Sequence, residues 1–300
     1  MIGFESIKSL LSTSYHNQKL HHAILLQGKR GIGKATFAKD FANEILQNSS
    51  ALNPDLLVIK KEEEKKEITV DRIHEISDFV NQTSASSLSK FIIIDSACEL
   101  NKSSSNALLK ILEEPRPNNF LILISHNQNR VLPTIRSRCQ IVKVPHLSYE
   151  NFCTILQQNN LYFSEQDLEF LCEICDSSPA ETIKYGKDLT RIYQLFLRSI
   201  TNKKLNDDLL KEVTAKNFPF LLIEKCCEFF FCRLQKLTQN QITKFYFEEE
   251  QTFYQILNSI PPKEVFIISD KALSLLRKTT SLNLDKKLTL INIFNLLNHD

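Results

Sequence analysis

A glycine-rich stretch, residues 28–36, constrains the fold of this 300-residue chain more than any other feature. The chain has five glycines, and three of them lie in this stretch: Gly28, Gly31 and Gly33. An apolar run precedes it at residues 23–26, and helix-like spacing follows at residues 37–46. A glycine-rich turn from a buried strand into a helix lets backbone N–H groups converge on an anion, and Lys34 adds a positive charge. The stretch therefore predicts a phosphate-binding loop.

One position in this loop departs from the pattern of nucleoside triphosphatases. That pattern places Ser or Thr directly after the lysine, because the hydroxyl group at that position binds Mg²⁺. In this chain Ala35 follows the lysine, and a hydroxyl group comes only at Thr36. We therefore expect a loop that can hold ATP or ADP, with or without Mg²⁺, and that hydrolyses ATP poorly.

Four further short apolar runs have the composition of strands, and the continuously apolar run at residues 91–94 is typical of a central strand that is buried on both faces of a sheet. They lie at residues 56–59, 91–94, 120–124 and 141–144. Segments with apolar residues at helical spacing separate these runs. Alternating strands and helices, with a phosphate-binding loop after the first strand, indicate an α/β fold with a parallel sheet. We expect residues 1–147 to form one nucleotide-binding domain.

Asp95 is the clearest candidate for a site residue outside the loop. It directly follows the apolar run at residues 91–94. In open parallel sheets, ligands bind in the crevice at the carboxyl ends of the strands. An acidic side chain at this point is therefore expected to face the crevice.

Three residues mark helix ends in this domain. Asn101 and Asp71 each precede apolar residues at helical spacing, so both are predicted to cap helices. Pro115 follows the helical pattern of residues 107–112 and is expected to end that helix.

From residue 148 onward the pattern is helical, because apolar residues recur at intervals of three and four and no strand-like run follows. A small helical domain is predicted for residues 148–200, and the polar stretch at residues 201–204 is expected to link it to a final helical domain, residues 201–300. This last region is rich in phenylalanine, and isolated helices could not bury that much apolar surface away from water. We expect it to form a helical bundle, either within this chain or shared with other subunits.

Composition argues against several classes of protein. With 37 basic and 35 acidic residues, the net charge of +2 creates no overall field toward nucleic acid or anionic lipid, so any DNA contact would need a local patch. No uncharged apolar run reaches the ~18 residues of a membrane span, and no basic and then apolar leader opens the chain. The eight cysteines lie mostly among apolar residues, which is typical of reduced thiols in a cytoplasmic protein.

Two of these cysteines, Cys172 and Cys175, have the spacing of metal ligands. No second pair and no histidine stands at a matching distance, so two thiols on one face of a helix explain the spacing better. Zinc is therefore not expected.

Four stretches together resemble the AAA+ clamp-loader family. They are residues 20–26, the loop at residues 28–36, residues 106–115 (Asn-Ala-Leu-Leu-Lys-Ile-Leu-Glu-Glu-Pro) and residues 137–139 (Ser-Arg-Cys). The last two are narrow signatures that are shared chiefly by clamp-loader subunits. The resemblance implies that the nucleotide-binding domain is of the AAA+ type, that residues 148–200 are its helical lid, and that residues 201–300 are an oligomerisation domain, the collar.

The resemblance also implies partners. Members of this family assemble with subunits of the gamma/tau and delta types of DNA polymerase III into a hetero-pentamer that acts in DNA replication. The assembly closes around primer–template DNA and loads the sliding clamp.

Several groups that active members of the family use are missing from this chain. Ser96 stands where active members carry Glu, Ala35 stands at the position of the loop hydroxyl, and the lid segment at residues 177–181 contains no arginine. Hydrolysis needs these groups together, and losing parts of such a unit lowers the rate by orders of magnitude. We therefore expect a non-catalytic subunit.

The alternative is an active AAA+ ATPase of the gamma/tau type. It would use Lys34 and Asp95, with Thr36 supplying the magnesium-binding hydroxyl group.

Two further roles come from the resemblance. In the family, the arginine of Ser-Arg-Cys, here Arg138, contacts the γ-phosphate that a neighbouring subunit holds, as an arginine finger supplied in trans. The alternative for Arg138 is a structural arginine that pairs with a nearby acid. Ser125 or Asn127, at the end of the fourth strand, would sense the phosphate, although a plain turn role fits them equally well.

Overall fold

The chain folds into two compact units. The first holds residues 1–155 with 178–180, and the second holds residues 156–177 with 181–300. The computed structural model describes the following residues: 2–47, 53–62, 65, 67–82, 89–215, 218–239, 241, 244–257 and 261–298. The finer division of the second half into a lid and a collar stays a prediction.

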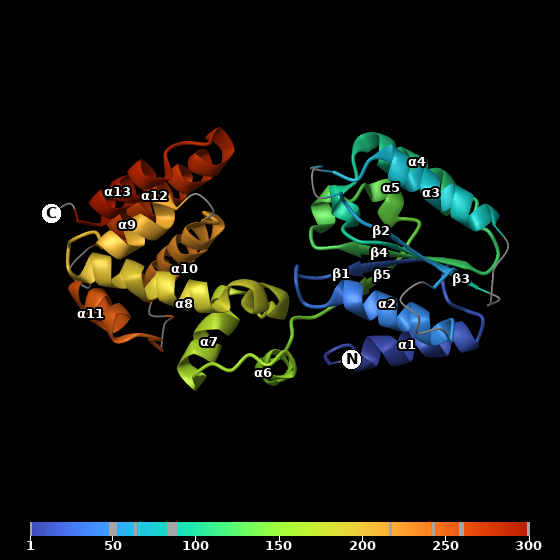
Figure 1. Ribbon diagram of the computed structural model, residues 1–300, viewed down its shortest axis with the longest axis horizontal. Helices are drawn as coiled ribbons and strands as arrows, with labels where there is room; N and C mark the ends of the chain where they lie inside the picture. The colour runs from blue at the N-terminus through green and yellow to red at the C-terminus, as the bar shows by residue number, and fades with distance from the viewer. Residues whose placement is uncertain are drawn as a thin grey trace. The chain divides into compact units, whose positions relative to one another are not determined.

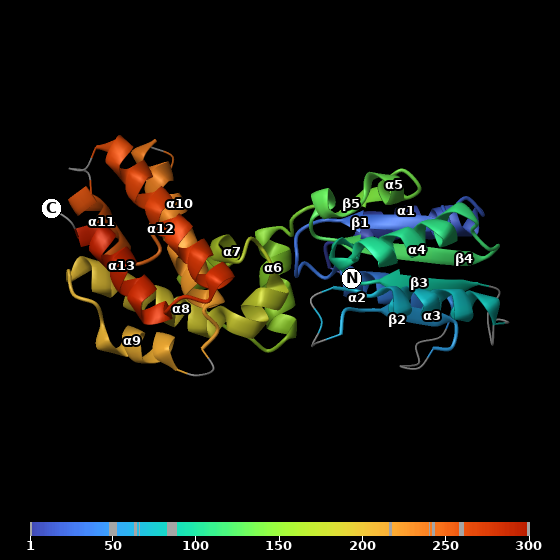
Figure 2. The same cartoon turned by 90° about the horizontal axis from the view of Figure 1, so that it is seen from above.

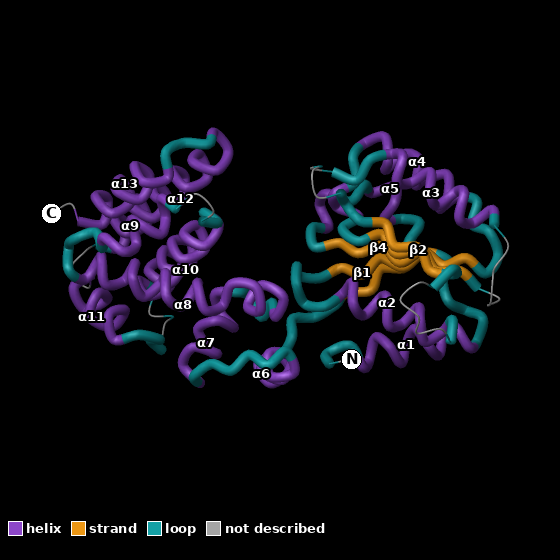
Figure 3. The backbone as a smooth tube through the Cα atoms, in the orientation of Figure 1, coloured by secondary structure: helices purple, strands orange, loops and turns teal. Residues whose placement is uncertain are grey.

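The first unit is built on a five-stranded parallel sheet (Figures 1 and 3). Its strands are β1 (Ala23–Gln27), β2 (Leu56–Ile59), β3 (Lys90–Ile94), β4 (Asn119–Ser125) and β5 (Gln140–Lys143). Their order in the sheet is β2-β3-β4-β1-β5. Gln27 lies level with Ser125 on one side and with Lys143 on the other, so the carboxyl ends of three strands meet beside the loop. The predicted parallel α/β fold is confirmed, and all five strands lie at the predicted apolar runs.

Helices cover both faces of this sheet (Figure 1). On one face lie α1 (Glu5–His16) and α2 (Lys34–Ile45); on the other lie α3 (Val70–Asn81), α4 (Lys102–Glu113) and α5 (Pro133–Arg136). Short 3₁₀ turns, η1 (Ala97–Glu99) and η2 (Gln128–Arg130), follow β3 and β4. Ile24 and Leu26 of β1 pack in the first layer, whereas Leu25 packs in the second. Successive strand residues point to opposite faces, which explains why the central strands β1, β3 and β4 carry apolar residues toward both layers.

The helix ends agree with the sequence patterns at α4 and differ at α3. The side chain of Asn101 caps α4, because its Oδ1 accepts a hydrogen bond from the Ser104 N–H at 2.8 Å. That helix ends at Glu113, before Pro115. The prediction that Asp71 caps α3 is wrong: the cap position is Thr69, whose backbone is extended, and Asp71 lies inside the first turn. A carboxylate in the first turn still stabilises the helix, because it interacts favourably with the positive end of the helix dipole.

The second unit is helical, as predicted. A connecting helix, α6 (Tyr149–Gln158), runs from the first unit into the second. The following helices are α7 (Glu165–Ile174), α8 (Pro179–Thr201), α9 (Asp207–Thr214), α10 (Leu221–Thr238), α11 (Glu248–Leu257), α12 (Pro262–Leu282) and α13 (Lys286–Asn298). Figure 2 shows α12 beside α10 and α13. None of the helices that the structure describes has the length and apolar character needed to span a membrane.

A buried ion pair ties the helices of the second unit together. Arg233 of α10 is 4% exposed, and its Nε lies 2.7 Å from a carboxylate oxygen of Glu250, which is 0% exposed. Glu173 of α7 receives a second guanidinium N–H at 2.9 Å. The carboxylate of Glu250 also accepts the Tyr193 hydroxyl at 3.3 Å and the Tyr246 N–H at 2.9 Å. The network joins α7, α8, α10 and α11.

Candidate functional site

The glycines of the loop are required by its geometry. Gly31 and Gly33 have φ angles of +78° and +97°, in the region that favours glycine. At Gly28, a Cβ atom would stand 2.8 Å from the carbonyl oxygen of Val144, so a side chain has no room. α2 begins directly after Gly33 and presents its free N–H groups at the loop. The loop is therefore shaped to hold a phosphate group.

Lys34 is buried inside this loop. Its ammonium group donates hydrogen bonds to the carbonyl oxygens of Gly28, at 2.8 Å, and of Lys29, and the residue is 5% exposed. The pKa of Lys34 is lowered to about 8, chiefly by burial; the nearby Cys98 and Asp95 oppose this shift, and the charge of Arg30 adds to it. A phosphate entering the loop would compete with the two carbonyl groups for this ammonium.

We expect the affinity of the isolated chain for ADP to fall as the pH rises through about 8. Because the pKa of Lys34 is lowered to about 8, the side chain is an ammonium below that pH and a neutral amine above it. An anion favours the ammonium form, so affinity should fall by up to about tenfold per pH unit above the pKa. Fluorescence titration with a labelled ADP between about pH 7 and pH 9.5 measures this. The variant Lys34→Gln should bind weakly with a flat profile, and a flat profile in the unaltered protein would contradict the expectation.

The set of oxygen ligands that would bind Mg²⁺ is incomplete at this site. Asp95 follows β3 directly, and its backbone N–H donates to the carbonyl oxygen of Ile59 at 2.9 Å. Ala35 packs against the apolar layer between the sheet and α1 and α2, and so offers no oxygen ligand. Thr36 has an exposed side chain and, within the described residues, makes no hydrogen bond to Asp95. The residues present suit a phosphate group, but they do not supply the paired oxygen ligands that Mg²⁺ needs.

A pocket of about 390 Å³ opens at the carboxyl ends of β1, β4 and β5. It is lined by Gln27, Gly28, Lys29, Ser125, His126, Asn127, Lys143, Val144 and His146. The hydroxyl group of Ser125 accepts the N–H of Asn127 at 3.2 Å and is buried, so Ser125 has the geometry of a turn residue. A phosphate-sensing role for Ser125 or Asn127 stays a prediction.

Sequence reasoning missed a contact between Cys98 and His126 beside this pocket. The thiol of Cys98 lies 3.3 Å from Nδ1 of His126. The pKa of His126 is lowered, first by burial and then by the nearby charge of Arg30, which outweigh Glu99. His126 comes directly after β4, so its place at a strand end was a usable signal. The cysteine sits in a short 3₁₀ turn that no sequence pattern marks.

Arg138 lies in the turn between α5 and β5. Its guanidinium forms an ion pair with Glu113 at 2.8 Å, and it donates to the carbonyl oxygen of Thr134 at 3.0 Å. The side chain of Arg138 is 37% exposed and that of Glu113 is 49% exposed. Surface pairs of this kind contribute about 0 to 1 kcal/mol, so a stronger anion can displace Glu113. The two narrow signatures of the sequence, residues 106–115 and 137–139, therefore meet at one contact.

Residues 178–180 pack onto the loop. The Ala180 N–H donates to the carbonyl oxygen of Gly31 at 3.2 Å, and a Cβ atom at Gly31 would collide with the hydroxyl group of Ser178. Glu181, the next residue, pairs with Lys225 of α10 at 2.7 Å. No arginine of residues 177–181 is available to the loop, because the segment contains none.

The two cysteines with metal-ligand spacing have different surroundings. Cys172 lies 3.4 Å from the hydroxyl group of Ser177, whereas burial raises the pKa of Cys175 to about 11. Among the residues that the structure describes, no three His, Cys, Asp or Glu side chains are grouped to hold a metal ion.

A parallel sheet in the order β2-β3-β4-β1-β5, with a phosphate-binding loop between β1 and α2, defines the first unit as a P-loop domain of the AAA+ class. The fold is similar to that of a DNA polymerase III gamma subunit-related protein from Thermotoga maritima. That structure has a TM-score of 0.50 and 22% sequence identity, and the match covers 98% of each chain.

Sequence comparison gives the family. Residues 3–148 match the family described as DNA polymerase III, delta subunit. The chain is 30% identical over 261 residues to the DNA polymerase III gamma subunit of Buchnera aphidicola from Schizaphis graminum, covering 80% of this chain and 70% of that protein. It is 33% identical over 180 residues to the delta' subunit of Pseudomonas aeruginosa, covering 54% of this chain and 50% of that protein. The chain therefore belongs to the DNA polymerase III clamp-loader family, as a member of the delta' type, and spans about half the length of the Pseudomonas relative.

Proposed function

We propose that this chain is a non-catalytic clamp-loader subunit of the replicative DNA polymerase. It would stabilise the ring that loads the sliding clamp onto primed DNA and would supply Arg138 to the ATP site of a neighbouring subunit. The observation that carries this proposal is the combination at the loop: a phosphate cradle with Lys34 stands beside Ala35 and Ser96, where hydrolysis needs oxygen ligands and an acid.

The surroundings of the loop support a static site. Ser96 has a φ angle of +71° and no carboxylate to polarise an attacking water molecule. Residues 178–180 cover Gly31 without bringing an arginine to it. Catalytic groups that act as a unit are not replaced by those that remain, so Lys34 and Asp95 alone would support little turnover.

Arg138 would work on a different site. Its guanidinium is partly exposed and is held in place by Glu113 and by the carbonyl oxygen of Thr134. An arginine that acts in trans needs an exposed, oriented guanidinium and does not need a working local site. The ion pair with Glu113 also fits the alternative, a structural role for Arg138, and the variant Arg138→Ala distinguishes the two roles.

The partners would be clamp-loader subunits of the gamma/tau and delta types in a hetero-pentamer. Contact with the sliding clamp and with primer–template DNA would come through that assembly, and residues 201–300 would provide the collar. We place the subunit in the cytoplasm, where the eight free cysteines would stay reduced.

An active ATPase of the gamma/tau type is the second candidate. The Buchnera gamma subunit matches 80% of this chain, and Lys34, Asp95 and Thr36 would have to supply its chemistry. ATP or ADP, with Mg²⁺, would then be a true cofactor.

An assembly experiment tests the proposed role. The purified chain is mixed with gamma-type and delta-type subunits from the same source, and the mixture is separated by size-exclusion chromatography with mass detection. We expect one complex that contains a single copy of this chain. Elution of the chain alone, or an ATP-dependent ring made only of this chain, would contradict the proposal.

A further inference from the structure

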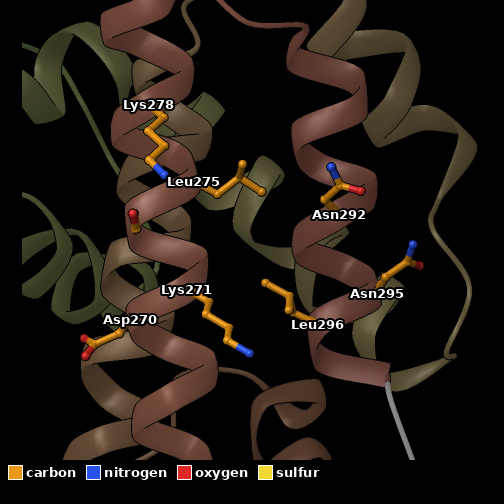
Figure 4. Close-up of a pocket in the computed structure, with 8 residues that line it drawn as sticks. Asp270, Lys271, Leu275, Lys278, Asn292, Asn295 and Leu296 are labelled. Carbon is orange, nitrogen blue, oxygen red and sulfur yellow. The ribbon is translucent and has the colours of Figure 1, made fainter.

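The helices α12 and α13 form an antiparallel pair with a groove between them (Figure 4). The groove has a volume of about 650 Å³ and is lined by Asp270, Lys271, Ser274, Leu275, Lys278, Asn292, Asn295 and Leu296. Leu275 and Leu296 point toward each other from opposite helices and form an apolar floor (Figure 4). Lys271 and Lys278 stand on one wall, and Asn292 and Asn295 stand on the other.

The polar side chains of this groove lack partners. Among the residues that the structure describes, the ammonium groups of Lys271 and Lys278 form no ion pair, and the amides of Asn292 and Asn295 form no hydrogen bond. Asp270, the one acidic residue of the lining, points away from α13 (Figure 4). The groove therefore presents several free donors, and its one carboxylate, on Asp270, is turned away from α13.

Positive charge is concentrated on these two helices. They carry six basic residues and two acidic ones, although the whole chain has 37 basic and 35 acidic residues. The basic residues are Lys263, Lys271, Arg277, Lys278, Lys286 and Lys287; the acidic ones are Glu264 and Asp270.

Exposed apolar side chains gather on the same hairpin. Eleven large hydrophobic residues are exposed in the described part of the chain, and five of them lie between residues 262 and 298. These five are Phe266, Ile267, Leu282, Leu284 and Leu288. Exposed apolar residues that gather on one element, next to unpaired charges, are typical of a surface that binds another protein.

We propose that the groove between α12 and α13 binds an acidic amphipathic helix of a partner protein. Apolar residues of that helix would pack on Leu275 and Leu296, and its carboxylates would pair with Lys271 and Lys278. The two lysines are seven residues apart, about 10.5 Å along α12, so acidic residues seven apart on a helix match their spacing.

A protein fits this groove better than a nucleic acid. None of the eight lining side chains is aromatic, whereas proteins that bind single strands stack bases on aromatic rings. The aliphatic floor formed by Leu275 and Leu296 offers a nucleic acid nothing to pair with, but it suits leucine side chains. The groove does not involve the phosphate-binding loop or Arg138, so its occupancy is independent of the role proposed for them.

A charge-swap experiment with synthetic helical peptides tests this binding site. The acidic probe has glutamates seven residues apart and leucines on the same face, and the basic probe has lysines in place of the glutamates. Fluorescence anisotropy should show that the full chain prefers the acidic probe by at least about tenfold. The variant Lys271→Glu/Lys278→Glu should reverse this preference. The control Lys263→Glu/Lys287→Glu makes the same change in net charge at two residues outside the groove. It should keep the preference for the acidic probe.

Three outcomes would overturn the proposed site. One is an equal loss of affinity for the acidic probe in both double variants, which would mean that binding depends only on the net charge of the protein. Another is undiminished binding of a probe with serines in place of its leucines. The third is binding of oligo-dT, but of neither peptide, that is lost in Lys271→Glu/Lys278→Glu. Circular dichroism of each variant verifies that the helices are intact.

Discussion

Replacing Arg138 with alanine is expected to reduce ATP hydrolysis at the neighbouring site of the assembled complex by about a thousandfold or more, because arginine fingers supplied in trans accelerate hydrolysis by 10³–10⁵. The steady-state rate of ATP hydrolysis by the whole complex should therefore fall by the amount that this one site contributes. The isolated chain should keep its fold, since Arg138 makes only a half-exposed ion pair with Glu113.

The control for this experiment is Arg130→Ala, which removes an exposed arginine from η2 in the same part of the first unit. Single-turnover hydrolysis by reconstituted complexes, compared at equal protein concentration, measures the effect. If Arg138→Ala and Arg130→Ala complexes hydrolyse ATP at the same rate, Arg138 is a structural arginine. The variant Glu113→Gln helps to separate the two roles, because it frees the guanidinium without removing it.

Replacing Arg233 with methionine is expected to lower the free energy of unfolding of the second unit by about 3 to 5 kcal/mol. The substitution leaves the carboxylate of Glu250 buried without its guanidinium partner, and Glu250 is 0% exposed. Removing one partner of a buried pair is costly because the remaining charge is then uncompensated. The stacking of the guanidinium over Tyr246, at 4.7 Å from the ring centroid, is lost as well.

Urea denaturation followed by far-ultraviolet circular dichroism measures this loss. The chain has no tryptophan, and the second unit is helical, so helix content is the natural signal. The matched control is Arg191→Met, because Arg191 pairs with Glu212 and Asp188 at the surface and is 56% exposed. That change should shift stability by less than about 1 kcal/mol. A loss in Arg233→Met as small as in the control would contradict the assigned role of the network.

Local patterns predicted the elements of the first unit well. The central strands were found because a strand that is buried on both faces is mostly apolar, and the loop was found because glycine is needed where φ is positive or a Cβ has no room. Asn101 was predicted as a cap correctly, whereas Asp71 was not. Thr69 and Asp71 are both capping residue types, and the choice between them depends on where the preceding extended segment turns.

Contacts between distant segments could not be predicted in the same way. Glu113 stood in the motif that suggested the family, yet only the fold brings it to Arg138. Arg233 and Glu250 lie on different helices, and no periodicity marks them as a buried pair. The groove of α12 and α13 also depends on how two helices align, which apolar spacing alone does not give.

The central claim is that this chain contributes to ATP hydrolysis in a complex without hydrolysing ATP itself. A steady-state ATPase assay of the purified chain, with Lys34→Ala as the control, tests it most directly. We expect the two proteins to show the same background rate, because Ala35 and Ser96 leave the loop without the groups that hydrolysis needs. Turnover near about one per second that disappears in Lys34→Ala would contradict the claim and identify an active ATPase.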